Sequence, residues 1–414
     1  MTQINNESLL KRRRAFEMSR AVVLSCALLV FAVASTSAED GDLDSLINSL
    51  FISSPGTVIA SSTSAPRPTS PPIGSQAACE RGQRCVQRYL CTNDSTSGAG
   101  LIDIRFDGDN PCVNYLAGCC YEEDIISELP TVPVLDNPTC GKRNPDGIGF
   151  RIVGGKDESE YGEFPWMIAV LKQEQALDQV VNVYLCGGSL IHPSVVLTAS
   201  HCVQNKSPVQ LKIRAGEWDT QTKNEVYPAS DRQVVEIVTH PDYYKGGLYN
   251  DVALIFLDSP LKLDDGIQTV CLPPPNAKFD HQRCFVSGWG KDVFGKAGTY
   301  QAILKKVELP VVPNSQCQTS LRSTRLGPKF VLHNSFMCAG GEVGKDACKG
   351  DGGSPLVCPI QGSTQSYHQT GIVSWGIGCG EATPGVYADV SHFRTWIDQQ
   401  MQSRHFDASS YTLS

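Results

Sequence analysis

Apolar and polar residues alternate over short stretches through the later part of the chain. Runs such as residues 234–238 are apolar and rich in β-branched side chains, and frequent Gly and Pro residues separate them. This pattern favours short antiparallel strands closed into β-barrels. Near the end, Phe393, Trp396 and Ile397 follow the spacing of one helical face, which predicts a helix over residues 392–401. We therefore expect an all-β domain closed by a C-terminal helix.

The N-terminus carries a different apolar pattern. Basic residues at 11–14 precede one continuous apolar run at 21–34, and small residues follow at 35–38. A positive region, an apolar stretch too short to span a bilayer comfortably and a small-residue exit are typical of a secretory signal peptide. We assign residues 1–38 to this signal, with a signal anchor as the alternative. No later apolar run is long enough to cross a membrane, so we expect no membrane span.

Residues 39–78 begin acidic and then become rich in Ser, Pro and Thr. Such a composition buries too little apolar surface to offset the conformational entropy of the chain. We therefore predict a disordered linker at 39–78.

Cysteine usage indicates an oxidising compartment. The chain has 17 cysteines in 414 residues, far more than is usual in the cytosol. Removing Cys26 with the signal leaves 16, an even number that suits complete pairing. The net charge of −8 argues against nucleic acid as a partner. We expect a secreted, extracellular protein, in which Asn93 and Asn205 begin glycosylation sequons.

A compact group of cysteines occupies residues 79–120. Its members are Cys79, Cys85, Cys91, Cys112, Cys119 and Cys120. Because so short a segment has little room for an apolar core, disulfides must stabilise its fold. Spacing alone leaves many cysteine pairings open. A zinc site is disfavoured because C-x2-C pairs and histidines are absent from this segment. We predict a small disulfide-rich domain at 79–120, followed by a proline-bearing linker at 121–151.

Three motifs beyond this linker carry catalytic residue types. Arg-Ile-Val-Gly-Gly stands at 151–155, Leu-Thr-Ala-Ser-His-Cys at 197–202 and Tyr-Asn-Asp-Val-Ala-Leu at 249–254. They resemble the activation junction, the general-base loop and the aspartate loop of trypsin-like serine proteases. The resemblance implies a double β-barrel over 152–400 with a tail at 401–414. It also implies that His201 is the base and Asp251 the residue that orients it.

The nucleophile loop departs from the family pattern. The family reads Gly-Asp-Ser-Gly-Gly-Pro, whereas residues 350–355 read Gly-Asp-Gly-Gly-Ser-Pro, which puts Gly352 in the serine position. The mechanism needs a hydroxyl within hydrogen-bond reach of the imidazole, and glycine has none. Ser354 lies two residues on, roughly 6–7 Å along an extended chain. We therefore expect no peptide cleavage, with His201 and Asp251 kept as a hydrogen-bonded pair.

A trypsin-like specificity pocket is also recognisable. Asp346 precedes the nucleophile position by six residues, where the resemblance places it at the pocket base to attract Arg or Lys. Ser374 and Gly376 resemble one wall of that pocket, and Gly385 belongs to the other. Two interpretations stay open: a peptide-binding pocket, or a collapsed pocket in which Asp346 is paired internally.

The cysteine-rich segment carries a second resemblance. Cys-Val-Gln-Arg-Tyr-Leu-Cys at 85–91, Leu-Ile-Asp-Ile-Arg at 101–105 and Tyr-Leu-Ala-Gly-Cys-Cys at 115–120 resemble the arthropod clip domain. With Gly352, they make the chain similar to insect clip-domain serine protease homologues of the non-catalytic prophenoloxidase-activating factor type. The pairs that the resemblance implies are Cys79–Cys119, Cys85–Cys112, Cys91–Cys120, Cys140–Cys271, Cys186–Cys202, Cys284–Cys358, Cys317–Cys338 and Cys348–Cys379.

By this resemblance the protein is a cofactor of the prophenoloxidase cascade, which drives melanisation in haemolymph as part of innate immunity. Its expected partners are phenoloxidase or prophenoloxidase and an upstream clip-domain serine protease, and a homo-oligomer after cleavage is kept open. Two alternatives remain: a matrix, adhesion or regulatory decoy protein, and a residual Arg/Lys-specific peptidase that recruits Ser354. Gly352 argues against the peptidase.

Two basic residues mark candidate cleavage sites. Cutting between Arg151 and Ile152 would free an N-terminus able to pair with Asp351, as in active relatives. Arg105 lies inside the clip segment, where related homologues are thought to be cut. We favour Arg105, because ordering a catalytic pocket has no benefit when the serine is missing.

No cofactor is expected, and calcium is the one alternative. Acidic residues cluster between positions 217 and 231, namely Glu217, Asp219, Glu225 and Asp231. Calcium needs about six to eight well-placed oxygen ligands, so a solvated acidic loop is the simpler interpretation.

Overall fold

The computed structural model describes most of the chain beyond residue 78. The described residues are 79–87, 90–91, 101–103, 112, 117–126, 139–148, 151–153, 157–176, 179–220, 227–290, 301–344, 351–363, 365–378 and 382–413, with 101–103 and 151–153 described by their backbone alone. The predicted signal peptide and the linker at 39–78 lie outside this part, as do Asn93, Arg105, Glu225 and Asp346. The chain divides into units 1–73 and 74–414, and all described residues belong to the second.

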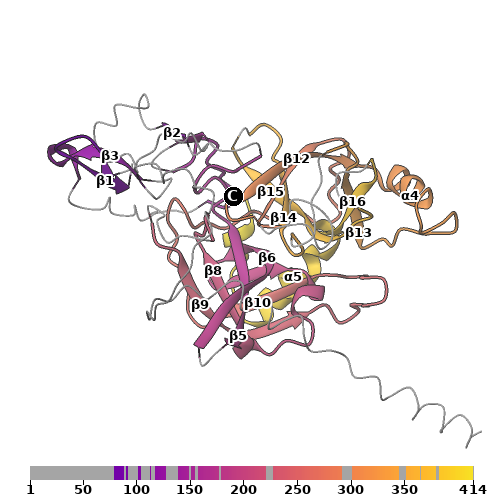
Figure 1. The fold of residues 1–414 in the computed structure, drawn as a ribbon. Coiled ribbons are helices and arrows are strands. Elements are labelled where there is room, and N and C mark those ends of the chain that lie inside the picture. Colours follow the sequence, from indigo (N-terminus) through magenta and orange to yellow (C-terminus); the bar gives the residue numbers. More distant parts are fainter. Residues whose placement is uncertain are drawn as a thin grey trace, which may run out of the picture. The chain divides into compact units, whose positions relative to one another are not determined.

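Two closed antiparallel barrels of six strands each form the body of this unit (Figure 1). The first has the strand order β10-β7-β6-β5-β8-β9, with β5 Met167–Ala176, β6 Gln179–His192, β7 Val195–Thr198, β8 Leu211–Ala215, β9 Ser230–Thr239 and β10 Ala253–Leu257. The second has the order β11-β12-β13-β16-β15-β14, with β11 Arg283–Gly288, β12 Lys305–Val312, β13 Phe336–Gly340, β14 Pro355–Pro359, β15 Tyr367–Trp375 and β16 Pro384–Asp389. The all-β double barrel expected from the sequence is confirmed.

Alternation along the strands places the core. In β8, Leu211, Ile213 and Ala215 are fully buried, while the residues between them are partly exposed. This is the period of two that a half-buried strand requires. The run at 234–238 falls in β9, where Val234 is buried and Val235 is exposed. The apolar core therefore fills the barrel interiors.

Helices occupy the edges of the barrels. They are α3 Ser200–Val203, α4 Asn314–Arg322 and α5 Val390–Ser403, with short 3-10 turns η2 Glu122–Asp124, η3 Pro208–Gln210 and η4 Ala408–Tyr411. The predicted closing helix is α5, which buries Phe393 and Ile397. It begins before residue 392 because Asp389 caps it, accepting a hydrogen bond from the Ser391 N–H at 3.0 Å. Within the described part of the chain, no helix has the length and hydrophobicity that a bilayer crossing needs.

The segment after α5 packs back onto the barrels. Tyr411 is fully buried, and its hydroxyl donates to Asp398 at 2.9 Å. Burial raises the pKa of this phenol, which stays neutral. Arg404 pairs with Glu236 at 2.6 Å. The region that the sequence suggested as a tail is therefore part of the folded domain.

A buried carboxylate joins the second linker to both barrels. Glu163, which is 0% exposed, forms ion pairs with Arg143 of the linker and with Lys306 of β12. The Arg143 guanidinium lies 4.1 Å from the ring centroid of Phe285, and Cys140 is bonded to Cys271 nearby. Residues 139–148 thus belong to the barrel domain, although the sequence suggested a linker.

The clip segment contains a short antiparallel pair, β1 Gln83–Gln87 with β3 Ala117–Tyr121. A second two-stranded sheet pairs β2 Leu101–Asp103 in parallel with β4 Arg151–Val153. The described disulfides are Cys79–Cys119, Cys85–Cys112, Cys91–Cys120, Cys140–Cys271, Cys186–Cys202, Cys284–Cys358 and Cys317–Cys338. These are seven of the pairs that the family resemblance implies, and the eighth, Cys348–Cys379, lies outside the described residues.

Replacing Tyr411 with alanine tests whether the C-terminal segment contributes to the core. Tyr411→Ala removes a fully buried ring, so the free energy of unfolding should fall by about 3–5 kcal/mol. Leu413→Ala is the matched control, since Leu413 is 47% exposed, and should change it by less than about 0.5 kcal/mol. Urea denaturation followed by tryptophan fluorescence measures both, and equal midpoints would show that the segment is dispensable.

Candidate functional site

His201, in α3 just after β7, and Asp251, just before β10, face each other. The Asp251 carboxylate is fully buried, and its Oδ2 lies 2.7 Å from the His201 Nδ1. Its Oδ1 accepts the backbone N–H of His201 at 2.8 Å, and the Ser374 hydroxyl donates to Oδ2 at 2.6 Å. These donors hold the imidazole in one orientation, with the Nδ1 proton toward the carboxylate and Nε2 directed away from it.

The short helix α3 holds His201 in place without a capping side chain. The Cys186–Cys202 disulfide ties it to β6 instead. Ser200, which replaces the family's usual alanine, is fully buried and donates its hydroxyl to the Val252 carbonyl at 2.6 Å. The substitution therefore adds a satisfied hydrogen bond between α3 and the residue next to Asp251.

Gly352 lies directly against the imidazole. A Cβ built on Gly352 would be 2.6 Å from His201 Nε2 and 3.2 Å from Cε1. A side chain at this position would thus point at the nitrogen that a general base uses, but glycine supplies no atom there. The separation is also shorter than ordinary contact, so a serine would fit only after the loop or the ring had moved.

Ser354 points elsewhere. It is fully buried, and its hydroxyl lies 2.0 Å from a Cβ built on Gly187 of β6 and 3.1 Å from one built on Gly288 of β11. Among the described residues, this hydroxyl has no hydrogen-bond partner. The side chain fills the seam between the two barrels, where a substrate could not reach it without opening that seam.

A backbone N–H group binds the Asp351 carboxylate in this chain, in which the bond before Ile152 is intact and gives no free N-terminus. Its Oδ1 accepts the Gly290 N–H at 2.8 Å. A Cβ on Gly288 or Gly290 would lie 2.3–2.4 Å from the carboxylate, so only glycine permits this close approach. Ile152, the residue that active relatives would bring to this aspartate, instead forms part of β4.

The predicted pocket residues have different surroundings. Ser374 directs its hydroxyl to Asp251, so it supports the His–Asp pair as well as following the pocket wall. Gly385 lies in β16, paired with Ala339 of β13. A Cβ on Gly376 would be in ordinary contact with the Gly378 carbonyl oxygen at 3.7 Å, so this position has room for a small side chain. Asp346 lies outside the described residues.

The loop before Asp251 contains features that the sequence did not indicate. Leu248 and Asn250 both have φ of 55°, which is unusual for leucine because its Cβ crowds the backbone there. The ring of Tyr249 stacks on His333 with centroids 4.3 Å apart. Burial, together with the charge of Asp251, raises the pKa of Tyr243 to about 12. Only the adjacent glycines at 246–247 gave a sequence signal for an unusual turn.

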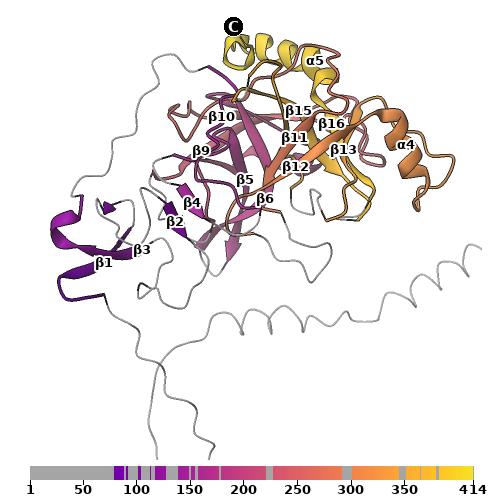
Figure 2. The same cartoon turned by 90° about the horizontal axis from the view of Figure 1, so that it is seen from above.

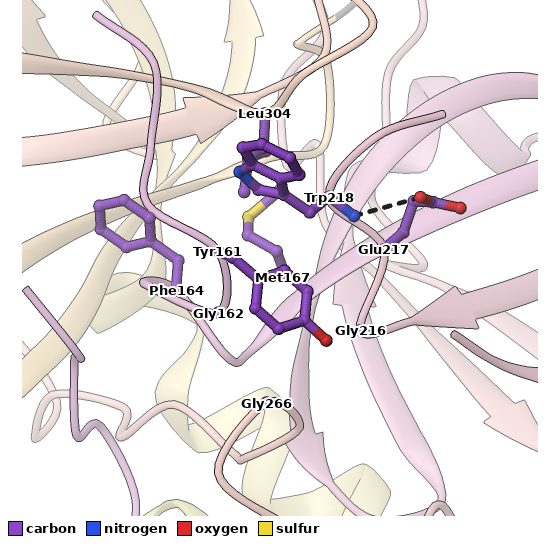
Figure 3. A pocket seen from close by; sticks show the side chains of 9 residues that line it. All are labelled: Tyr161, Gly162, Phe164, Met167, Gly216, Glu217, Trp218, Gly266 and Leu304. Atoms are coloured by element: carbon purple, nitrogen blue, oxygen red, sulfur yellow. Dashed lines mark hydrogen bonds between the residues drawn. The ribbon is translucent and has the colours of Figure 1, made fainter. Parts of the chain in front are cut away.

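The acidic loop considered for calcium is partly neutralised by Arg214. Its Nε donates to Asp231 at 2.7 Å and its Nη1 to Glu217 at 3.1 Å. Burial opposes ionisation of Asp231, but the hydrogen bonds and positive charges of Arg214 and Lys212 together outweigh it and lower the pKa of this carboxyl. The other Glu217 oxygen accepts the Trp218 N–H at 3.1 Å, beside a cavity of only about 10 Å3 (Figure 3). Two of the four acidic residues, Glu217 and Asp231, thus accept hydrogen bonds from Arg214.

The Ser354 hydroxyl, which has no hydrogen-bond partner among the described residues, leads to a prediction about stability. A buried polar group without a partner costs about 1–3 kcal/mol, so Ser354→Ala should raise the free energy of unfolding. Ser189 provides the matched control, because it is equally buried but donates its hydroxyl to Gln369. Ser189→Ala should lower the same quantity. Thermal unfolding of both variants decides the matter, and a destabilised Ser354→Ala would contradict the packing described here.

Comparison with known proteins agrees with this geometry. The trypsin family matches residues 152–397, and the family described as serine protease clip domain PPAF-2 matches residues 73–121. Phenoloxidase-activating factor 2 of Galleria mellonella is 55% identical over 298 residues, covering 70% of this chain and 98% of that protein. The inactive CLIP domain-containing serine protease A8 of Anopheles gambiae is 38% identical over 329 residues, covering 78% and 89%.

A third relative, phenoloxidase-activating factor 3 of Holotrichia diomphalia, is 33% identical over 303 residues, covering 70% of this chain and 81% of that protein. Both domains are thus matched, and so is nearly the full length of the Galleria relative. The chain belongs to the trypsin family, among its clip-domain serine protease homologues.

Proposed function

We propose that this protein is a secreted, catalytically inactive cofactor that supports the activation of prophenoloxidase. The observation that carries this proposal is Gly352, which faces the His201 Nε2 where a serine hydroxyl would be needed. The relatives named as phenoloxidase-activating factors support the role in prophenoloxidase activation. The relative named as an inactive protease supports the absence of catalysis.

Catalysis fails in this proposal for lack of a nucleophile. Loss of the catalytic serine lowers kcat of a serine protease by roughly a million-fold. The remaining groups hold the fold: His201 comes from the first barrel and Ser374 from the second, and both hydrogen-bond to Asp251. The hydrogen bond from Ser374 to Asp251 therefore links the barrels. A pocket formed by Asp346, Ser374, Gly376 and Gly385 would bind an Arg or Lys side chain without cleaving it.

Secretion and processing complete the proposal. Seven disulfides in the described residues fit an extracellular protein, and haemolymph is the expected compartment. An upstream clip-domain protease would cut at Arg105, and the processed protein would engage phenoloxidase or prophenoloxidase. A homo-oligomer after this cut, and glycans at Asn93 and Asn205, are part of the same proposal.

Two exposed apolar side chains directly after the clip segment are available to a partner. Tyr121 is 40% exposed and Ile126 is 38% exposed, and the Ile126 N–H donates to the Leu90 carbonyl at 2.8 Å. Large apolar side chains left exposed beside a small disulfide-held domain favour a protein-binding surface. A patch around these residues is therefore our candidate contact with phenoloxidase.

Activity measurements on the nucleophile position test the pseudoenzyme proposal. Wild-type protein should hydrolyse no Arg or Lys ester, and a serine-directed phosphonate should leave Ser354 unlabelled. Gly352→Ser combined with Ser354→Gly should show weak hydrolysis, limited by the 2.6 Å separation at Gly352. Adding His201→Ala to that double variant should abolish it. Phosphonate labelling of wild-type Ser354 would refute the proposal.

Phenoloxidase activation by a separate protease tests the processing step. Prophenoloxidase is incubated with an activating protease, and phenoloxidase activity is compared with and without this protein. Arg105→Gln should lose most of the support given by wild type, because its clip segment stays uncut. Arg81→Gln, an exposed clip arginine outside the Cys91–Cys112 loop, is the matched control and should behave as wild type. Full support from Arg105→Gln would place the switch outside the clip segment.

A further inference from the structure

The strand β2 of the clip segment pairs with the junction that opens the protease-like domain (Figure 2). The pairing is parallel, with Leu101 opposite Arg151 and Ile102 opposite Ile152. Two segments that are about fifty residues apart in sequence thus share one small sheet. The Arg151–Ile152 bond lies inside the paired strand β4 rather than on an unpaired loop.

The segment that carries this bond is short and anchored at both ends. Before it, Ile148 is buried and its N–H donates to the Tyr161 carbonyl at 2.9 Å. After it, the Asp157 carbonyl accepts the Lys306 N–H at 2.8 Å. Neither end can slide outward without breaking contacts with the barrels. While β4 is paired with β2, one edge of this segment is therefore closed to a protease.

Proteases bind a scissile segment as an extended strand and form main-chain hydrogen bonds along its edge. A strand already paired with a neighbour has one edge occupied, and its cleavage must wait for local opening. The rate of cleavage at Arg151 is then proportional to the fraction of molecules in which β4 has separated from β2. An intact β2 should consequently slow cleavage at Arg151.

The position of β2 depends in turn on an intact disulfide-bounded loop. β2 lies between Cys91 and Cys112, which are bonded to Cys120 and Cys85 respectively. While this loop is continuous, both ends of β2 are held to the clip segment. A cut between Asp103 and Cys112 would release the C-terminal end of β2 and weaken its pairing with β4.

We propose that β2 is a guard strand, which protects the Arg151–Ile152 bond until the loop between Cys91 and Cys112 is cut. The two candidate cleavage sites are then ordered, with the clip loop first and the junction second. This inference rests on the proposed processing at the clip loop. It supplies a structural reason for Arg151 to be cut later than the clip loop.

Limited digestion of the full chain with trypsin tests the guard strand. All variants carry Arg105→Gln, so that the loop stays intact, and the rate at which the Ile152 N-terminus forms is measured by mass spectrometry. Leu101→Pro and Ile102→Pro are compared with alanine at the same positions. Neighbouring residues of a parallel strand turn their N–H groups to opposite edges, so at least one proline removes a ladder bond.

At least one proline variant should be cut at Arg151 about tenfold faster than the Arg105→Gln parent, and the alanine variants should resemble that parent. Hydrogen exchange provides an independent measurement: the amides of residues 151–153 should be protected in the parent and exchange faster in the accelerated proline variant. Unchanged cleavage in both proline variants, or unprotected amides in the parent, would overturn the proposal. Neither measurement uses phenoloxidase, so this outcome is separate from that of the proposed function.

Replacing residues 107–110 with the recognition sequence of an unrelated viral protease provides a second route that leaves β2 unaltered. Cutting this inserted site before adding trypsin should accelerate cleavage at Arg151 to a similar extent. If the precut protein is cleaved at Arg151 no faster than the uncut one, continuity of the loop does not maintain the guard and the proposal fails.

Discussion

The buried charge of Asp251 is the constraint around which the two barrels meet. A carboxylate with no solvent exposure must be satisfied by donors, and those donors come from His201 on one barrel and Ser374 on the other. Removing any of them would leave part of the charge uncompensated inside the protein. The arrangement that orients a catalytic base thus also satisfies a buried carboxylate where the two barrels meet.

Similar buried pairs join the remaining parts. Glu163 connects the segment preceding the junction with β12, and the Cys140–Cys271 disulfide reinforces the same attachment. After any cut at Arg151, the preceding segment would remain docked by one covalent bond and one buried ion-pair cluster. Within the described residues, the short β2–β4 pairing connects the clip segment to the junction through backbone alone.

The sequence predicted the barrels and the closing helix because strand alternation and helical spacing are local signals. It located the Gly352 substitution through a motif, since a nucleophile loop has a fixed order. It missed the packing of Tyr411 and the linker contacts of Arg143, because both depend on residues distant in the chain. The direction of the Ser354 hydroxyl and the ion pairs of Arg214 with acidic side chains likewise depend on three-dimensional packing, which no local sequence pattern reveals.

The close approach of Gly352 to His201 limits what a single substitution can restore. The backbone lies where a Cβ would stand only 2.6 Å from the imidazole. Ser354 meanwhile occupies the barrel seam against Gly187, a position that other members of the family fill with glycine. A single reverting mutation would therefore meet a steric barrier before it regained any activity. A hydroxyl at position 352 would therefore need changes in the backbone of this loop and in the packing of the barrel seam at the same time.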